Sequence, residues 1–222
     1  KIATGFVSQK GGLQNVTVTP GLVEKYLGPR KYYYEVADET NRVGVTTGLV
    51  WTEVGGAIIF IEAAKMKGKG ELILTGSLGD VMRESAHAAL SYIRSHAHAF
   101  RIDENFYDGQ DIHVHIPQGA IQKDGPSAGA AIAIALVSLL TSRPARREVA
   151  ISGELTLTGR ILPVGGIKEK LLAARQAGVK IIILPLKNRI DAENLSEDVK
   201  RDVKIVYADN IDEMTGLVLL DG

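Results

Sequence analysis

The residues best suited to chemistry lie in the segment 123–129, which reads Lys-Asp-Gly-Pro-Ser-Ala-Gly. Proline suits the first turn of a helix, because the N–H that it lacks has no partner there. The hydroxyl of Ser127 would then stand beside unpaired backbone N–H groups at the positive end of a helix. A nucleophile next to oxyanion donors is the arrangement that acyl transfer requires. A plain helix cap or a phosphate-binding turn uses the same pattern, so both alternatives stay open.

A histidine is the usual base for a catalytic serine, but the histidines of this chain are poorly placed. The pattern 125–129 fits the nucleophile elbow of α/β-hydrolases, in which a histidine follows the serine. Here all five histidines precede Ser127, which leaves only a His-Asp-Ser order open: His87, His96, His98, His113 and His115. The last two share one face of a predicted strand, where we expect polar packing or surface exposure. Two histidines without a third ligand make a poor metal site, so no metal is expected.

A neutral lysine can replace histidine as the base, and Lys170 is the best candidate. At an ordinary pKa near 10.4, only about one lysine in 2,500 is neutral at pH 7. Lys170 lies in the first turns of a helix that Gly165-Gly166 is expected to open. Burial and the helix dipole both lower a lysine pKa there. We expect Lys168, two residues earlier, to be solvated, and an exposed helical lysine is also the alternative for Lys170.

The elements that must position these residues indicate a mixed α+β domain. The β-rich runs 45–51 and 57–63 predict a hairpin, and 71–75 predicts a third strand. Asp80 is expected to cap a long amphipathic helix, and the apolar segment 127–140 predicts a buried helix. Further strands are expected at 111–116, 148–152, 155–161, 180–184 and 203–207, and further helices at 165–176, at 191–200 and from 209.

Composition narrows the class of protein. The chain has 222 residues, of which 45% are hydrophobic, and it has no cysteine, which excludes disorder and a disulfide scaffold. Its 26 basic and 26 acidic side chains give no net charge, which argues against a nucleic-acid surface. The longest apolar run, 128–140, is too short to cross a membrane. The chain has no signal-peptide pattern, and its first residue is lysine. We therefore expect it to be a cytoplasmic fragment of a longer protein.

Several separated segments together resemble the proteolytic domain of the Lon family of ATP-dependent proteases, of the bacterial type with a fused AAA+ ATPase. The segment 123–129 is similar to the Lon nucleophile motif, and 165–170, Gly-Gly-Ile-Lys-Glu-Lys, is similar to its lysine motif. Residues 47–56 and 74–85 are similar to further segments of the family. One departure is Gln122, where the family usually has proline, so the loop before Ser127 is expected to be looser.

The resemblance implies a single Lon-type proteolytic domain of α+β class, with mixed sheets and packed helices, at residues 34–222. Residues 1–33 resemble the end of the AAA+ small subdomain and a linker. The activity implied is that of a serine endopeptidase with a catalytic dyad of Ser127 and Lys170. Ser152, where the family often has threonine, would hydrogen-bond the lysine.

The resemblance also implies an oxyanion hole and a substrate groove. Backbone N–H groups of Ser127 and Ala128 would form the oxyanion hole. An extended substrate peptide would lie along a segment formed by Trp51, Thr52, Glu53 and Val54. We further expect that Asp124 can pair with Lys170 and hold it charged, because a nearby carboxylate raises a lysine pKa.

Cofactors and partners follow from the same family. No phosphate-binding loop of the Gly-x-x-x-x-Gly-Lys-Ser/Thr type occurs, so ATP and Mg²⁺ are expected only in the ATPase portion, and no cofactor in these residues. The implied partners are misfolded and regulatory protein substrates in protein quality control, and copies of the chain in a homo-hexamer, with no membrane or nucleic acid. The alternatives are a phosphate-binding domain like that of a small-molecule kinase and a non-catalytic relative that only binds peptides.

Overall fold

The computed structural model describes residues 17, 19–28, 40–52, 55–117 and 123–221. The chain divides into two compact units, 1–34 and 35–222. In the first unit, helix α2 (Pro20–Leu27) begins at a proline, and Thr19 Oγ1 accepts a hydrogen bond of 3.3 Å from the N–H of Leu22. The predicted boundary at 33–34 lies outside the described residues, and the assignment of 1–33 to an ATPase subdomain stays a prediction.

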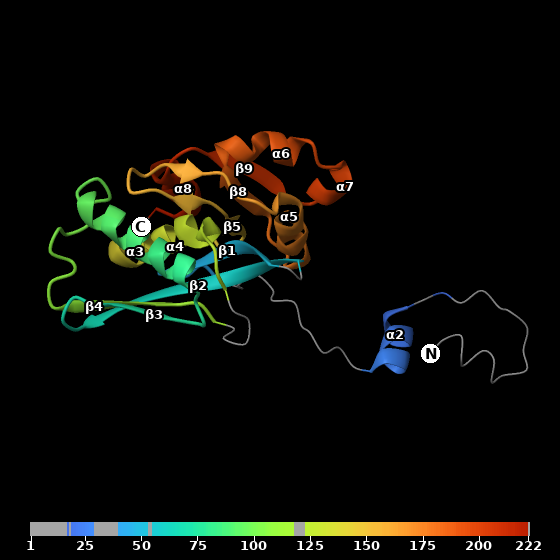
Figure 1. The fold of residues 1–222 in the computed structure, drawn as a ribbon, viewed down its shortest axis with the longest axis horizontal. Helices are drawn as coiled ribbons and strands as arrows, with labels where there is room; N and C mark the ends of the chain where they lie inside the picture. The colour runs from blue at the N-terminus through green and yellow to red at the C-terminus, as the bar shows by residue number, and fades with distance from the viewer. Residues whose placement is uncertain (1–16, 18, 29–39, 53–54, 118–122, 222) are drawn as a thin grey trace, which may run out of the picture. The chain divides into compact units, whose positions relative to one another are not determined.

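The second unit is built around one large mixed β-sheet with helices packed against it (Figure 1). Its strands are β1 (Val45–Thr52), β2 (Gly55–Lys67), β3 (Leu72–Thr75), β4 (Gln110–His115), β5 (Val149–Ile151), β8 (Ile181–Pro185) and β9 (Lys204–Ala208), with β6 (Glu154–Leu155) and β7 (Ile161–Leu162) forming a separate hairpin. Its helices are α3 (Asp80–Ser95), α4 (Gly129–Thr141), α5 (Ile167–Gln176), α6 (Arg189–Glu193), α7 (Glu197–Lys200) and α8 (Ile211–Val218), with 3₁₀ turns η1 (Pro126–Ala128) and η2 (Leu186–Asn188).

The strand order in the seven-stranded sheet is β3-β4-β2-β1-β5-β8-β9. The predicted hairpin is confirmed: β1 and β2 are antiparallel, from Val45 opposite Glu62 to Thr52 opposite Gly55. On the other side of β1 the pairing is parallel: β1 pairs with β5, β5 with β8, and β8 with β9. Because the carboxyl ends of parallel strands share one edge, the ends of β1 and β5 come together there.

The two faces of the sheet bury separate hydrophobic clusters. Alternation along β1 places Val50 in a cluster with α3, α4 and α8, and Leu49 in a second cluster with α5, α6 and α7. Helix α4 is buried without a break from Gly129 to Ser138, as its sequence predicted. In Figure 1, α3 and α4 lie side by side. The domain therefore has three layers, with the sheet in the middle.

Three predicted elements differ from the structure. The segment 155–161 forms the hairpin of β6 and β7 instead of one strand, because Gly159 adopts a positive φ of 79° and Thr156 Oγ1 accepts a hydrogen bond from Arg160 N in the turn. The segment 191–200 forms two short helices, since the extended backbone of Ser196 interrupts it. Helix α3 does begin at Asp80, but its N-cap residue is Gly79 and no side chain there caps it.

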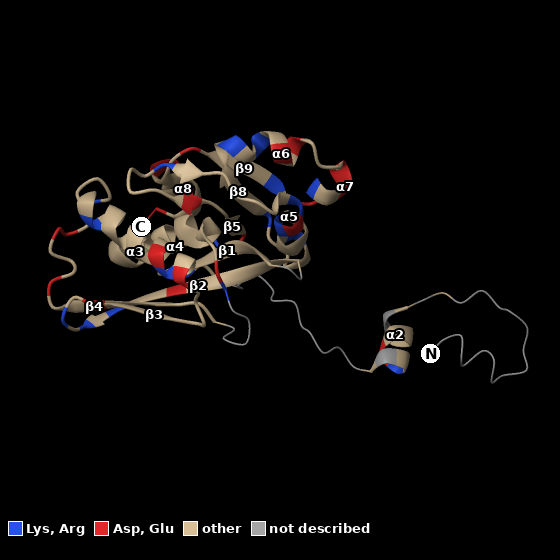
Figure 2. Ribbon diagram, in the orientation of Figure 1, with Lys and Arg blue, Asp and Glu red and all other residues tan. Residues whose placement is uncertain are grey.

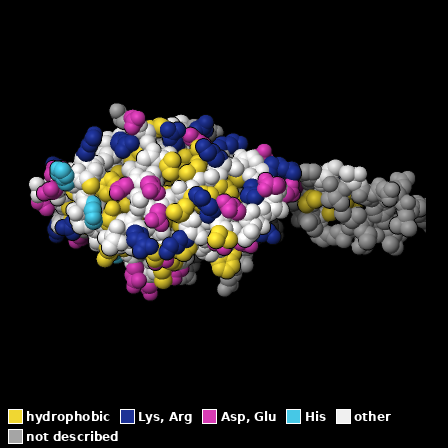
Figure 3. Space-filling view, turned by 90° about the horizontal axis from the view of Figure 1, so that it is seen from above, with side chains coloured by type: hydrophobic (Ala, Val, Ile, Leu, Met, Phe, Trp, Pro, Cys, Tyr) yellow, Lys and Arg dark blue, Asp and Glu magenta, His cyan; other side chains and the backbone are white. Residues whose placement is uncertain are grey.

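Charge is unevenly placed on the elements of the second unit. Helices α6 and α7 carry both basic and acidic residues, whereas β1 and α4 carry no charged residue (Figure 2). The face in Figure 3 likewise mixes both signs of charge with small apolar areas. Among the described residues, no helix combines the length and apolar character needed to span a membrane.

Candidate active site

The first candidate, Ser127, is held at the N-terminal end of α4 by contacts with the segment after β5. It lies in the 3₁₀ turn η1, and the N–H of Gly153 donates a hydrogen bond of 2.9 Å to its carbonyl. The N–H of Ala130 in turn donates to the Gly153 carbonyl at 3.0 Å. The turn therefore fixes the backbone of Ser127 against the carboxyl end of β5, while its side chain is half-buried.

Ser152 links this turn to β1. Its side chain is 0% exposed, and its hydroxyl lies 3.3 Å from the carbonyl oxygen of Leu49 and 3.5 Å from that of Ser127. Both distances are long for O–H donors, so the hydroxyl is shared weakly between two carbonyls. A hydroxyl that donates its one proton can still accept hydrogen bonds through the lone pairs of its oxygen. The Ser152 oxygen is therefore able to accept a hydrogen bond from a lysine amine.

The second candidate, Lys170, is buried. Its side chain is only 1% exposed, and it lies on α5 between Ile167 and Leu171, which belong to the same hydrophobic cluster as Leu49. Burial lowers the pKa of Lys170 to about 8, because the charged amine loses its hydration. No salt bridge joins Lys170 to a carboxylate among the described residues. The expectation of an exposed helical lysine is thus excluded.

Glycines allow α5 to approach the hairpin closely enough to bury Lys170. A Cβ atom on Gly56 of β2 would stand 2.1 Å from the carbonyl oxygen of Glu169. Gly166, the N-cap of α5, has a φ of 68°, and a Cβ there would stand 2.6 Å from Cγ of Trp51. The lysine helix is therefore seated directly on the end of the β1–β2 hairpin.

The predicted substrate groove is described in part. Trp51 is 57% exposed, and Thr52 Oγ1 donates to the carbonyl of Gly55 at 3.1 Å. Glu53 and Val54 lie outside the described residues. The pairing of β1 with β5 covers Thr47 and Gly48, and β1 then continues past the end of β5. The stretch of β1 beyond that pairing is a suitable edge for an added strand.

Leu49 links Ser152 to the helix that carries Lys170. Its carbonyl contacts the Ser152 hydroxyl, and its side chain packs in the cluster that contains the α5 residues around Lys170. No hydrogen bond joins the Lys170 amine to the hydroxyl of Ser127 or Ser152 within the described residues. Catalytic hydrogen bonds are often long without substrate, so the dyad and the Ser152 contact stay predictions.

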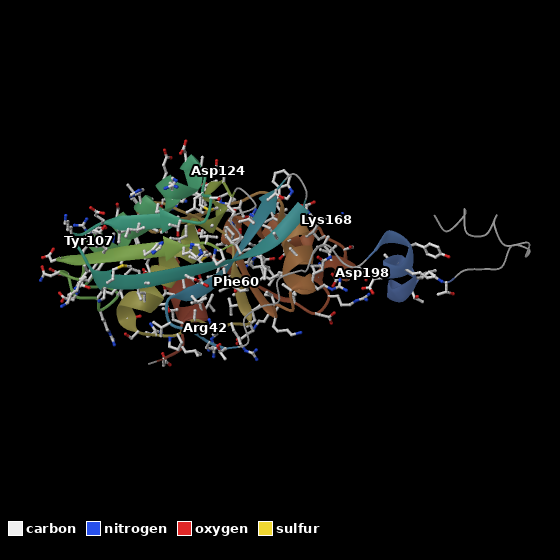
Figure 4. All side chains as sticks on the ribbon, turned by 90° about the horizontal axis from the view of Figure 1, so that it is seen from below. Arg42, Phe60, Tyr107, Asp124, Lys168 and Asp198 are labelled. Atoms are coloured by element: carbon white, nitrogen blue, oxygen red, sulfur yellow. The ribbon has the colours of Figure 1, made fainter. Side chains whose placement is uncertain are left out.

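Asp124 contacts α3 rather than Lys170. Its Oδ1 accepts hydrogen bonds of 3.1 Å from the N–H of Met82 and 2.9 Å from that of Gly125. This carboxylate therefore caps α3, the role that the sequence predicted for Asp80. Figure 4 shows Asp124 beside α3, away from α5 with Lys168. No ion pair between Asp124 and Lys170 occurs among the described residues, and that pairing stays a prediction.

Two substitutions separate these roles of Asp124. Asp124→Ala is expected to destabilise the domain by about 1 kcal/mol, because α3 loses its N-terminal acceptor, whereas Asp124→Asn keeps an acceptor and should cost little. Thermal unfolding of both variants measures this difference. If Asp124 also pairs with Lys170, the pH profile of peptide cleavage should move to lower pH in Asp124→Asn. Equal stability of the two variants would contradict the capping role.

The two strand histidines form a polar contact, as expected. Thr75 Oγ1 lies 2.8 Å from Nε2 of His113 and 2.7 Å from Nδ1 of His115, across β3 and β4. Within the part of the chain that the structure describes, no cluster of three or more histidine, cysteine or acidic residues could hold a metal ion.

Two positioning residues were missed by the sequence interpretation. Gly56 was assigned to the hairpin connection, although its lack of a side chain serves the packing of α5. Asn188, which is 2% exposed, hydrogen-bonds both the N–H and the carbonyl of Val164. Buried asparagine is uncommon, but nothing local to position 188 signals a partner 24 residues away.

Comparison with known proteins identifies the family of this chain. The model of the Lon protease (S16) C-terminal proteolytic domain matches residues 17–221. A Lon protease of Aquifex aeolicus is 55% identical over 99% of this chain and 27% of that protein. Lon proteases of Geobacter metallireducens and Vibrio parahaemolyticus are 52% and 50% identical, over 95% and 93% of this chain and 26% of each relative. The chain thus spans about a quarter of the length of the curated relatives that it matches.

The fold and these matches define a proteolytic domain of the serine endopeptidase class. More particularly, the chain belongs to the Lon protease (S16) C-terminal proteolytic domain family. The family resemblance predicted from the motifs is therefore confirmed.

Proposed function

We propose that this domain cleaves peptide bonds with Ser127 as the nucleophile and Lys170 as the general base and acid. Ser127 Oγ attacks the scissile carbonyl carbon while the neutral amine of Lys170 takes the hydroxyl proton. The resulting oxyanion is bound by the backbone N–H groups of Ser127 and Ala128. Lys170 then gives its proton to the leaving amine, which departs and leaves an acyl ester on Ser127. Water, deprotonated by Lys170, hydrolyses that ester.

The observation that carries this proposal is the burial of Lys170, which forms no ion pair with a carboxylate among the described residues. At a pKa of about 8, roughly one Lys170 in ten is neutral at pH 7, a gain of about 250-fold over an ordinary lysine. A lysine that binds phosphate must instead be charged, and burial without a carboxylate opposes the charge. This argues against the kinase-like alternative.

Substrate binding is proposed to extend the sheet. An unfolded peptide would pair with β1 beyond Gly48, past Trp51 and Thr52 towards Glu53 and Val54, and so pass Ser127 in extended form. Backbone hydrogen bonds supply affinity in this mode without demanding one sequence. The proposal therefore fits misfolded or unfolded protein substrates of varied sequence, with regulatory proteins among them.

The assignments for the complete protein are proposals that rest on its family. The complete protein would couple this domain to an AAA+ ATPase that uses ATP and Mg²⁺, assemble as a homo-hexamer in the cytoplasm, and serve protein quality control. The domain alone, which offers no ATPase motif in its sequence, is expected to cut small or unstructured peptides.

A pH profile tests the neutral-lysine mechanism. Cleavage of an unstructured fluorogenic peptide is expected to rise from pH 6 to 10 with a midpoint near 8, because the rate follows the neutral fraction of Lys170. Ser127→Ala serves as the blank and should show no cleavage. A flat profile, or cleavage that survives in Ser127→Ala, would contradict the proposal.

A further inference from the structure

We propose that Asn188 is a positioning residue that fixes the turn 163–166 and thereby sets where Lys170 enters the active site. This inference rests on the proposed role of Lys170. Asn188 ends the 3₁₀ turn η2 after β8, and the helix that follows it, α6, packs in the hydrophobic cluster that contains α5. It does not contact Ser127 or the substrate groove in the described residues, so it acts through α5.

The first argument is that the Asn188 side chain hydrogen-bonds a segment distant in the sequence. As the N-cap residue of α6, an asparagine would ordinarily accept a hydrogen bond from its own helix, but Asn188 makes no such bond. Its Oδ1 accepts instead from the N–H of Val164 at 2.9 Å, and its Nδ2 donates to the Val164 carbonyl at 2.9 Å. The side chain therefore binds both backbone groups of one residue.

The second argument is that the amide has a fixed orientation. Nδ2 of Asn188 also donates to Oδ2 of Asp191 at 2.8 Å. If the amide were flipped, its oxygen would face the Val164 carbonyl and the Asp191 carboxylate, both of which are acceptors. Asp191 thus holds the amide in the single orientation that satisfies Val164.

The third argument is that α5 lacks a cap of its own. Gly166, its N-cap residue, has no side chain to offer, and Lys170 N donates its helical hydrogen bond of 2.9 Å to the Gly166 carbonyl. The first turn of α5 is therefore held by contacts from other segments: the hairpin contacts Gly166 and Glu169, and Asn188 binds Val164, two residues before Gly166. Loss of the Val164 bonds would free the turn and let water reach Lys170.

The acidic groups near α5 form no ion pair with Lys170 among the described residues, so they do not explain its environment. Within the described residues, no ion pair links Lys170 to an acidic group of its own helix or of the elements packed on α5: Glu169 on α5, Glu62 on β2, Asp191 and Glu193 on α6, and Glu197 and Asp198 on α7. The environment of the amine therefore depends on how deeply α5 buries it, which is the quantity that Asn188 controls.

The test compares Asn188→Asp and Asn188→Ala with Asn194→Ala, whose exposed side chain lies on the same segment. Both Asn188 variants should lose about tenfold or more in kcat for the fluorogenic peptide, with KM within about twofold, since a displaced base slows chemistry and leaves the groove intact. The midpoint of the pH profile should move upwards, towards that of an ordinary lysine. Asn194→Ala should match the unmutated chain.

Asp191 supplies a rescue experiment. Asp191→Asn keeps an acceptor for Nδ2 of Asn188 and should retain kcat and the pH midpoint, whereas Asp191→Ala should shift both in the direction of the Asn188 variants. A purely structural role would lower the melting temperature of these variants without moving the pH midpoint. That outcome, or an unchanged kcat in folded Asn188→Asp, would overturn the inference.

A measurement independent of cleavage separates this inference from the proposed function. ¹³C NMR of ε-labelled lysine, assigned with Lys170→Ala, reports the pKa of Lys170 directly. An ordinary value in the unmutated chain would refute the neutral-lysine mechanism and, with it, this inference. A lowered value that stays the same in Asn188→Asp would refute only the role of Asn188. A lowered value that rises in Asn188→Asp supports both.

Discussion

Replacing Lys170 by methionine should abolish peptide cleavage and at the same time stabilise the domain. Methionine fills a similar volume without a charge. Lys170 is buried and its pKa is lowered to about 8 in the folded state, so the unfolded chain holds this proton more tightly. The difference of more than two pKa units corresponds to about 3 kcal/mol at most at pH 7, which the substitution would recover. For a domain of this size, that gain raises the melting temperature by up to roughly 6–12 °C.

The size of this stability gain changes with pH in a defined window. Below pH 8 the amine is charged in both states, and the full cost of burying it is present. Between about 8 and 10.5 the unfolded chain binds more protons than the folded one, so the unmutated domain gains stability as pH rises. The advantage of Lys170→Met should therefore shrink across that window.

Two matched variants control this prediction. Lys168→Met changes an exposed lysine on the same helix and should leave both cleavage and melting temperature close to those of the unmutated chain. Ser127→Ala should be inactive without the stability gain. Calorimetry at pH 7 and pH 10 gives the comparison. A Lys170→Met variant that is less stable at pH 7 would contradict this prediction. It would show that Lys170 forms an ion pair in solution, for which Asp124 is the candidate partner.

The local features of this site were accessible from sequence because they depend on neighbours in the chain. The proline before Ser127, the unbroken apolar run of α4 and the glycines before α5 each predicted an element that the structure contains. The burial of Lys170 was harder to predict, because the residues beside it allow either an exposed or a buried face. It depends on the hairpin that covers α5.

The features that could not be predicted depend on partners far away in the chain. Asp80 has the right residue type and position for a cap, but Asp124, 42 residues from Met82, supplies the acceptor. The same holds for Asn188, whose partner Val164 lies 24 residues away in the loop before α5. Capping preferences state which side chains can satisfy a helix end, and tertiary packing decides which one does.

Gly56→Ala should damage both stability and catalysis through a single contact. The added Cβ would stand 2.1 Å from the Glu169 carbonyl oxygen and 3.0 Å from Lys170 N. Both are backbone atoms, so no side chain can rotate away and α5 must move. Overpacking of this kind costs about 3 kcal/mol, and a displacement of about 1 Å at the base lowers the rate about 100-fold. Thermal unfolding and peptide cleavage well below the melting temperature measure the two effects separately.

The neighbouring glycines sharpen that test, because each is required for a different reason. Gly55 has open space around its Cβ position but a φ of 126°, so Gly55→Ala should cost stability through backbone strain and leave α5 in place. Gly216 in α8 has neither restriction, and Gly216→Ala should stabilise the domain by up to about 1 kcal/mol. A loss of cleavage in Gly56→Ala that exceeds the loss in Gly55→Ala at equal folded fraction would locate the effect at the contact with α5. Equal losses would mean that the hairpin, rather than its contact with the lysine helix, limits catalysis.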